Sequence, residues 1–374
     1  MKRASLVGAL LALSLCFWNC SKARMAVPSL IDGANPLHVY GSEQSGRYYK
    51  SIHHFFLDKK ARVYLWDVVT FDHVDVYDER GGFLFQFGRN GQGPGELQGV
   101  ICGAVDSKSD IWLADDQKSL KIYSANGEFK QNWPLPPDVA KSSIYKLAFD
   151  NDDDLYILGM GNQGQAQIYR CDAKNGQCRQ VYSEERRQRS QFVLFVPDFA
   201  LDDDGNLYVT DGFDYRLHVF DKEGESLRQH DVRKGGMKRI VEADFDMFDV
   251  DSKVIRFSGY EAILGLLTGP SRYYPEIFGV NIDGGLIYVW TAERDDKARY
   301  IVDVYDKDFK RIGQACYFNM IRENAATIID GKLYIPSIEN YDTKLTKKVG
   351  PLAFLNIPDR LNAYPVTKMI QEQP

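Results

Sequence analysis

The chain has 374 residues, of which 44% are hydrophobic and 26% are charged. This balance is that of a soluble globular protein, and it excludes collagen, a coiled coil, bulk disorder and a polytopic membrane protein. The net charge is −6, from 46 Lys and Arg against 52 Asp and Glu, and no basic tract is present, which argues against nucleic-acid binding. The 22 Tyr, 21 Phe and 31 Gly residues favour β structure with many turns.

The N-terminus has the pattern of an export signal. Residues 1–3 are Met-Lys-Arg, and residues 4–18 form an apolar run broken by small residues. Such a run is too short for a membrane span and fits the hydrophobic part of a signal peptide. We therefore expect residues 1–19 to be a signal peptide.

A cysteine at the end of this run predicts attachment of a lipid. Cys20 resembles the acylation site of a bacterial lipoprotein, although Asn19 is larger than the residue usual before that site. Cys16 is the competing site, and secretion without a lipid or retention of an uncleaved anchor stays open. Lipidation at Cys20 predicts an exported protein in the bacterial cell envelope, on the periplasmic face or the cell surface. Residues 20–45 would then link the lipid to the folded domain.

A short pattern recurs along residues 46–374. An acidic turn is followed by an aliphatic–aromatic pair, and then by a second strand that ends near glycine. The aromatic residues of the pairs are Tyr64, Trp112, Tyr156, Tyr208, Tyr288 and Tyr334. Four of the five intervals match the roughly 40–50 residues of one four-stranded propeller blade, and the longest leaves room for an insertion at about 235–275. The sequence therefore predicts an all-β, six-bladed β-propeller of four-stranded antiparallel blades, although five or seven blades stay open.

Two repeats carry a family resemblance. Residues 106–115 with 120–127, and residues 202–211 with 215–224, resemble NHL repeats. Residues 88–96 are similar to the blade-linking segment of six-bladed propeller lipoproteins of bacterial envelopes. The resemblance implies the fold and an envelope location. It implies no particular activity.

Two pairs of segments are expected to form contacts. Leu37–Tyr40 is expected to pair with Leu352–Leu355 in the last blade and to close the ring, which protects both edges. Cys171 and Cys178 flank a turn that contains Asn175-Gly176, and opposite positions of such a hairpin lie close enough for a disulfide. Two free thiols are the alternative, since a metal site would need two further ligands nearby.

Several acidic residues are of a type that could bind a metal ion. Asp67, Asp115 and Asp211 each follow an aliphatic–aromatic pair, and we expect them to accept backbone hydrogen bonds in the turns. The runs at 150–154 and 202–206 lack the ligand spacing of an EF-hand and are expected to be acidic β-turns.

His53 and His54 lie in the predicted innermost strand of the first blade, so one of them is expected to face the central channel. Zinc would need three such ligands from different blades, and the sequence offers one. No cofactor is therefore predicted. A divalent metal held by acids and amides of the channel stays open, because such ligands form no local motif.

The insertion at 235–275 is rich in aromatic residues. Phe257, Tyr260, Tyr273 and Tyr274 are the candidate partner surface, with a local cap on the insertion's own blade as the alternative.

The sequence favours a non-catalytic envelope lipoprotein that presents its propeller to a protein, peptide or glycan. The alternative is a metal-dependent propeller hydrolase or lyase with its site in the central channel. The sequence contains neither a Gly-x-Ser-x-Gly elbow nor a His-Glu-x-x-His motif.

Overall fold

The computed structural model describes residues 36–41, 47, 49–50, 52, 54–67, 73–115, 119–161, 165–184, 197–211, 216–232, 277–294, 300–317, 326–338 and 359–366. The insertion at 235–275 lies outside these residues. Within them, no helix has both the length and the apolar character needed to span a membrane.

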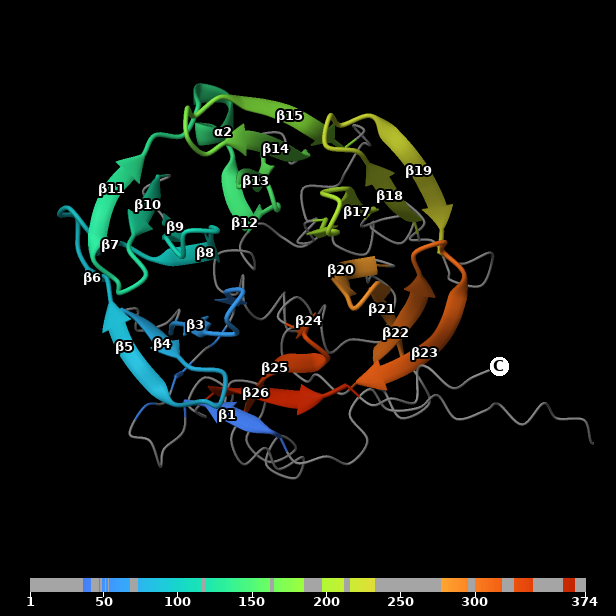
Figure 1. The fold of residues 1–374 in the computed structure, drawn as a ribbon, viewed down its shortest axis with the longest axis horizontal. Coiled ribbons are helices and arrows are strands. Elements are labelled where there is room, and N and C mark those ends of the chain that lie inside the picture. Colours follow the sequence, from blue (N-terminus) through green and yellow to red (C-terminus); the bar gives the residue numbers. More distant parts are fainter. Residues whose placement is uncertain are drawn as a thin grey trace, which may run out of the picture.

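Six four-stranded antiparallel sheets stand around one axis, which confirms the predicted six-bladed propeller (Figure 1). Blades 1 and 2 are β2 (Phe55–Leu57), β3 (Val63–Leu65), β4 (Val74–Tyr77), β5 (Phe83–Phe87), and β8 (Val100–Val105), β9 (Ile111–Asp115), β10 (Leu120–Tyr123), β11 (Phe129–Trp133). Blades 3 and 4 are β12 (Ser143–Phe149), β13 (Asp154–Met160), β14 (Ala166–Asp172), β15 (Cys178–Ser183), and β16 (Phe199–Leu201), β17 (Leu207–Asp211), β18 (Arg216–Phe220), β19 (Ser226–Asp231). Blades 5 and 6 are β20 (Ile277–Asp283), β21 (Leu286–Arg294), β22 (Tyr300–Asp306), β23 (Arg311–Tyr317), and β24 (Thr327–Ile329), β25 (Lys332–Ile338), β26 (Asp359–Pro365), β1 (His38–Tyr40).

Two short connections carry structure of their own. Between blades 1 and 2, β6 (Arg89–Asn90) pairs in parallel with β7 (Glu96–Leu97). Between blades 2 and 3, the chain forms the helix α2 (Pro137–Ala140).

The repeated aromatic residue occupies the second strand of every blade. All six of these side chains are buried, and each packs in a core that lies between neighbouring blades. Both faces of a blade are therefore apolar at their centre, as stacked sheets require. The spacing of these residues therefore predicted the number of blades correctly.

The first strand of the chain closes the ring. In the register of β1 with β26, His38 lies opposite Ala363 and Tyr40 lies opposite Leu361. The expected partner, Leu352–Leu355, was wrong, because the strand that lies beside β1 begins at Asp359. The last blade is therefore built from both ends of the propeller.

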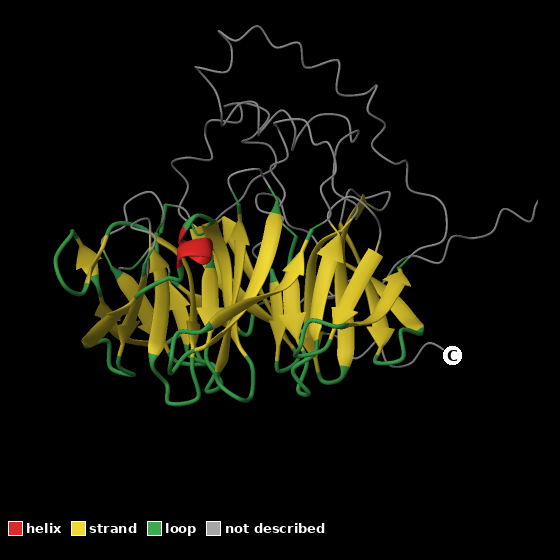
Figure 2. Ribbon diagram, turned by 90° about the horizontal axis from the view of Figure 1, so that it is seen from above, coloured by secondary structure: helices red, strands yellow, loops and turns green. Residues whose placement is uncertain are grey.

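Aspartates organise the short turns on the face of the disc that lies away from α2 (Figure 2). In each turn one carboxylate oxygen accepts the backbone N–H groups two and four residues further on, which satisfies donors that the turn leaves unpaired. These aspartates are Asp58, Asp78, Asp106, Asp150, Asp202, Asp221 and Asp306. The runs at 150–154 and 202–206 are accordingly turns. Among the described residues, no three His, Cys, Asp or Glu side chains are gathered to hold a metal ion.

Four of these aspartates, Asp58, Asp106, Asp150 and Asp202, are the acidic residues that precede the aliphatic–aromatic pairs of blades 1 to 4. The Tyr64 hydroxyl donates to Asp58 Oδ2 at 3.4 Å, and the Tyr208 hydroxyl donates to Asp202 Oδ2 at 3.3 Å. In blades 1 and 4, the spacing of six residues therefore joins the turn to the core of its own blade.

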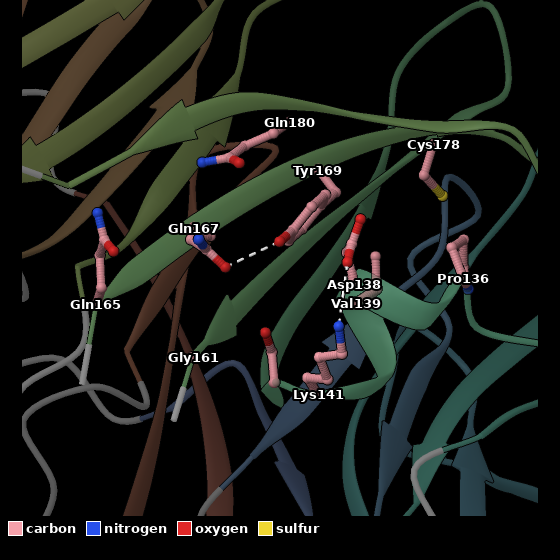
Figure 3. Close-up of a pocket in the computed structure, with 11 residues that line it drawn as sticks. Pro136, Asp138, Val139, Lys141, Gly161, Gln165, Gln167, Tyr169, Cys178 and Gln180 are labelled. Carbon is pink, nitrogen blue, oxygen red and sulfur yellow. Dashed lines mark hydrogen bonds and ion pairs between the residues drawn. The ribbon is translucent and has the colours of Figure 1, made fainter. Parts of the chain in front are cut away.

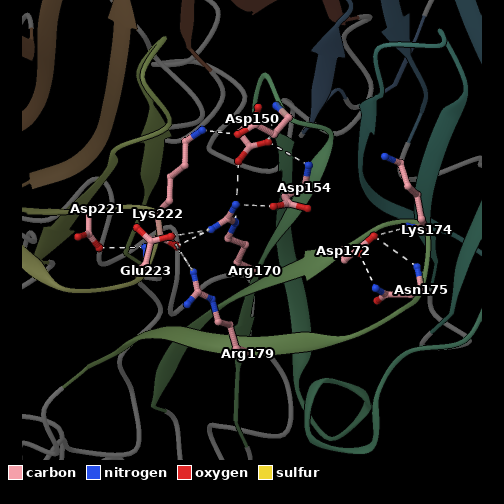
Figure 4. Close-up of polar contacts among 11 residues, drawn as sticks. Asp150, Asp154, Arg170, Asp172, Lys174, Asn175, Arg179, Asp221, Lys222 and Glu223 are labelled. Carbon is pink, nitrogen blue, oxygen red and sulfur yellow. Dashed lines mark hydrogen bonds and ion pairs between the residues drawn. The ribbon is translucent and has the colours of Figure 1, made fainter.

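Ion pairs hold blade 3 to blade 4 near the same face (Figure 4). Arg170 of β14 lies 2.5 Å from Asp154 of its own blade and donates to the Lys222 carbonyl at 2.8 Å. Glu223 lies 3.7 Å from Arg170, and the Lys222 ammonium pairs with Asp152. The contacts of Lys222 and Glu223 with Arg170 and Asp152 therefore join blade 4 to blade 3.

Candidate functional site

One register position of the third strand is polar in all six blades. It lies opposite the residue that follows the repeated aromatic. The residues at this position, here called the polar ring, are Asp75, Lys121, Tyr169, His218, Asp303 and Asn362. All are buried except His218, which is half-buried. Because burying a polar group without a hydrogen bond is costly, every blade must supply partners at this depth.

In blade 1, the segment that enters the blade supplies those partners. The Tyr49 hydroxyl donates to Asp75 Oδ2 at 2.6 Å, and Arg47 lies 3.0 Å from Asp75 Oδ1. His73 Nε2 lies 3.1 Å from the same oxygen. Burial, followed by the charges of Tyr77 and Asp75, raises the pKa of Tyr49, so its hydroxyl remains a donor at neutral pH.

Blade 2 repeats this arrangement with the opposite charge. The Lys121 ammonium lies 2.7 Å from Asp115 Oδ2 and also donates to the carbonyl of Glu96, in the connection from blade 1. Ser119 donates to Asp115 at 3.2 Å. Asp115 therefore pairs with a buried lysine and a hydroxyl. Asp67 accepts the N–H of Lys50 at 2.5 Å. The side chain of Asp211 lies outside the described residues.

In blade 3 the corresponding space is hollow. The connection from blade 2 forms α2, and a cavity of about 500 Å³ lies between this helix and the faces of β14 and β15 (Figure 3). This volume is within the range of about 300–1,000 Å³ that is typical of ligand sites. Tyr169, the polar-ring residue of blade 3, lines it.

Glutamines and tyrosine share the wall that β14 presents to the cavity. The alternation of the strand places Gln165, Gln167 and Tyr169 on this side, while Ala166 and Ile168 pack in the core toward blade 4. Gln180 of β15 lines the same cavity. The face that meets blade 2 is therefore apolar at its centre and polar toward the end where α2 lies.

Hydrogen bonds fix the orientation of two of these amides. The Tyr169 hydroxyl donates to Gln167 Oε1 at 2.8 Å, which leaves the amide NH₂ of Gln167 as its donor group. Gln165 Nε2 donates to Ser183 Oγ at 2.7 Å and to the Glu184 carbonyl at 2.6 Å, which leaves its Oε1 as an acceptor. The wall thus offers an acceptor and a pair of donors side by side.

The charges of the cavity lie at its rim. Asp138 and Lys141 of the α2 segment are exposed and lie 3.5 Å apart, so their attraction is screened by solvent. Burial, and then the charge of Asp138, raises the pKa of Tyr169. Its phenol therefore stays protonated at neutral pH, and the depth of the cavity offers neutral groups.

The sequence-predicted site residues have different outcomes. Cys171 and Cys178 lie opposite each other in β14 and β15 and form the expected disulfide, with their Cα atoms 4.0 Å apart. His54 is half-buried and directly precedes β2, the innermost strand of blade 1. The remaining predicted site residues lie outside the described residues: Cys20, His53, Phe257, Tyr260, Tyr273 and Tyr274.

Near the axis, the described charges join blades. Lys146 of β12 lies 2.6 Å from Asp198 and donates to the Phe199 carbonyl at 2.7 Å. Asp198 Oδ2 accepts the N–H of Val280 at 3.0 Å. This contact links blades 3, 4 and 5 through their first strands, and sequence reasoning missed it because the three residues lie far apart in the chain.

Comparison with known proteins supports the fold. Residues 49–197 match a family model, DUF5128, described as a 6-bladed beta-propeller. No curated protein matches the chain in sequence. A solved member of the DUF4221 family from Bacteroides vulgatus is 14% identical, with a TM-score of 0.54 over 90% of this chain and 95% of that chain.

Two further structures are similar over most of their length. A protein from Bacteroides fragilis, provisionally described as exported, is 15% identical, with a TM-score of 0.49 over 88% of this chain and 94% of that chain. Regucalcin from Agrobacterium tumefaciens, a calcium-binding protein, is 14% identical, with a TM-score of 0.47 over 92% and 95%. At 14% identity the DUF4221 structure supports the fold alone. The resemblance of two repeats to NHL repeats stays a prediction.

Proposed function

We propose that the chain is a non-catalytic binding module of the bacterial cell envelope, which takes a small, neutral, polar ligand in the cavity of blade 3. One observation carries the proposal. In blade 3 the space beside the polar-ring residue is a cavity lined by oriented amides, whereas in blades 1 and 2 the chain itself fills this space. In those blades Asp75 and Lys121 find partners in the entering segments. In blade 3 the wall around Tyr169 keeps donors and acceptors directed at open space.

The chemistry of the lining supports binding over catalysis. General acid–base catalysis uses a group whose pKa lies near the working pH. The pKa of the Tyr169 phenol is raised, which moves it further above neutral pH. Asp138 and Lys141 are exposed at the rim. Fixed neutral amides are suited to recognising a ligand.

The proposed location rests on two features. Cys20 follows a signal-like segment, and a lipid on its thiol would hold the propeller at a membrane. The disulfide between Cys171 and Cys178 supports export, because such bonds persist in oxidising compartments such as the bacterial periplasm.

Lipidation makes a direct prediction for Cys20→Ala. The full chain expressed in a Gram-negative host should partition into the detergent phase of a Triton X-114 extract and incorporate labelled palmitate. Cys20→Ala should lose the label and move to the aqueous phase, while Cys16→Ala should behave as the wild type. Loss of the label in Cys16→Ala, with retention in Cys20→Ala, would assign the lipid to Cys16.

The ligand site predicts an effect of Gln167→Leu on retained small molecules. A soluble form, residues 21–374, lacks the signal peptide and Cys20 but contains every described strand. It would be incubated with the low-molecular-weight fraction of a periplasmic extract. Mass spectrometry should detect at least one neutral compound that is retained by the wild type and lost with Gln167→Leu, because leucine removes both amide donors. The matched control is Gln131→Leu, an exposed position on β11 outside the cavity. Identical retention by all three proteins would refute the cavity as the binding site.

A further inference from the structure

The arrangement of donors and acceptors indicates a class of ligand for the proposed cavity. We infer that the cavity binds a sugar unit of a neutral glycan through its hydroxyl groups. This inference rests on the proposed function and deepens it. It is carried by the fixed orientation of Gln165 and Gln167, by the placement of charge, and by the position of the cavity on the face of a sheet.

Gln165 and Gln167 present complementary groups. Both amide protons of Gln165 are used by Ser183 and Glu184, so it offers an acceptor, whereas the oxygen of Gln167 is used by Tyr169, so it offers donors. Two residues along a strand separate the pair by about 6.6 Å. A hydroxyl both donates and accepts, so neighbouring hydroxyls of one sugar ring can satisfy both amides.

The placement of charge argues against an ionic ligand. Phosphate and carboxylate groups are typically held by arginine, which binds them through two parallel hydrogen bonds. Among the described side chains that line the cavity, Lys141 is the cation, and it lies at the rim, 3.5 Å from the carboxylate of Asp138. That carboxylate would repel an anion, and the amide donors of Gln167 would repel a cation.

The position of the cavity argues against an extended peptide. A peptide strand binds by pairing its main chain with an unpaired sheet edge. Gln167 and Tyr169 are carried by β14, which is paired on one side with β13 and on the other with β15. A ligand in the cavity therefore meets side chains. Tyr169 is 7% exposed, and its hydroxyl donates to Gln167 Oε1.

The test is a screen followed by calorimetry on the soluble form, residues 21–374. A glycan array is screened first, and maltotriose, cellotriose, trigalacturonate and trialanine are then titrated. At least one neutral glycan should bind to the wild type. Gln167→Glu keeps the size of the side chain but replaces the donors by a charged acceptor, and it should weaken that binding about tenfold or more. Gln131→Glu should leave the affinity unchanged, and thermal unfolding would verify that both variants are folded.

The remaining outcomes separate the inference from the proposed function. If no neutral glycan binds, while trialanine or an extract compound is retained by the wild type and lost with Gln167→Leu, the saccharide inference is wrong and the binding function stands. Tighter binding of trigalacturonate than of any neutral glycan would also overturn the inference. If no probe and no extract compound distinguishes the wild type from the Gln167 variants, both fail.

Discussion

Replacing Tyr40 by alanine is expected to lower the free energy of unfolding of the propeller by about 3–5 kcal/mol, as for other large buried aromatic residues. Tyr40 is fully buried in β1. Its ring lies 5.9 Å from that of Tyr77 and 6.2 Å from that of Tyr334, and its hydroxyl donates to the Glu79 carbonyl at 3.0 Å. The side chain therefore joins the first blade to the last, and its loss weakens the contact that closes the ring.

Urea unfolding, followed by tryptophan fluorescence, checks this prediction. Leu37→Ala is the matched control, because Leu37 precedes β1 and is 49% exposed, so its removal should cost less than about 0.5 kcal/mol. Tyr40→Phe keeps the ring packing and loses the hydrogen bond, and it should cost about 1 kcal/mol. Equal midpoints for Tyr40→Ala and Leu37→Ala would mean that β1 does not hold the ring closed.

Replacing Lys121 by methionine is expected to destabilise the propeller by about 3–5 kcal/mol, since it breaks a buried ion pair. Lys121 is 3% exposed and Asp115 is 1% exposed. The substitution leaves the Asp115 carboxylate without the Lys121 ammonium, and it also removes the donor to the Glu96 carbonyl. The connection between blades 1 and 2 should therefore loosen together with the core of blade 2.

The double variant Lys121→Met, Asp115→Leu separates the cost of an uncompensated charge from the loss of packing. Because an apolar pair of similar volume can replace a buried ion pair, the double variant should recover most of the lost stability. Lys130→Met is the exposed control, since the pair of Lys130 with Asp110 lies at the surface and should contribute less than about 1 kcal/mol. A double variant as unstable as Lys121→Met would show that the hydrogen bond to Glu96 dominates.

The blades could be predicted because their signal is local. In blades 1 to 4, the aromatic residue of each aliphatic–aromatic pair lies six residues after an aspartate that forms a turn. The closing strand was harder to assign. The apolar run Leu352–Leu355 looked more like a strand than Asp359–Pro365, because β26 carries Asn362 at the buried position of the polar ring. Because Asn362 interrupts the apolar pattern of β26, the hydrophobic pattern of the sequence did not predict this strand.

The cavity could not be predicted for a different reason. Gln165 and Gln167 alternate with Ala166 and Ile168, as on any solvent-facing side of a strand. Whether that side meets solvent, packed chain or a hollow depends on where α2 crosses above it, which is a property of the connection from blade 2. The polar ring was equally hidden, since its six residues share a register position and no residue type.

The most direct test of the proposed glycan site is a crystal structure of residues 21–374 with the tightest neutral glycan from the screen. We expect a sugar ring between α2 and the face of β14 and β15, with hydroxyls within hydrogen-bond distance of Gln165 Oε1 and Gln167 Nε2. A glycan bound instead near the axis, beside His54 or Lys146, with the blade 3 cavity free of ligand, would contradict it.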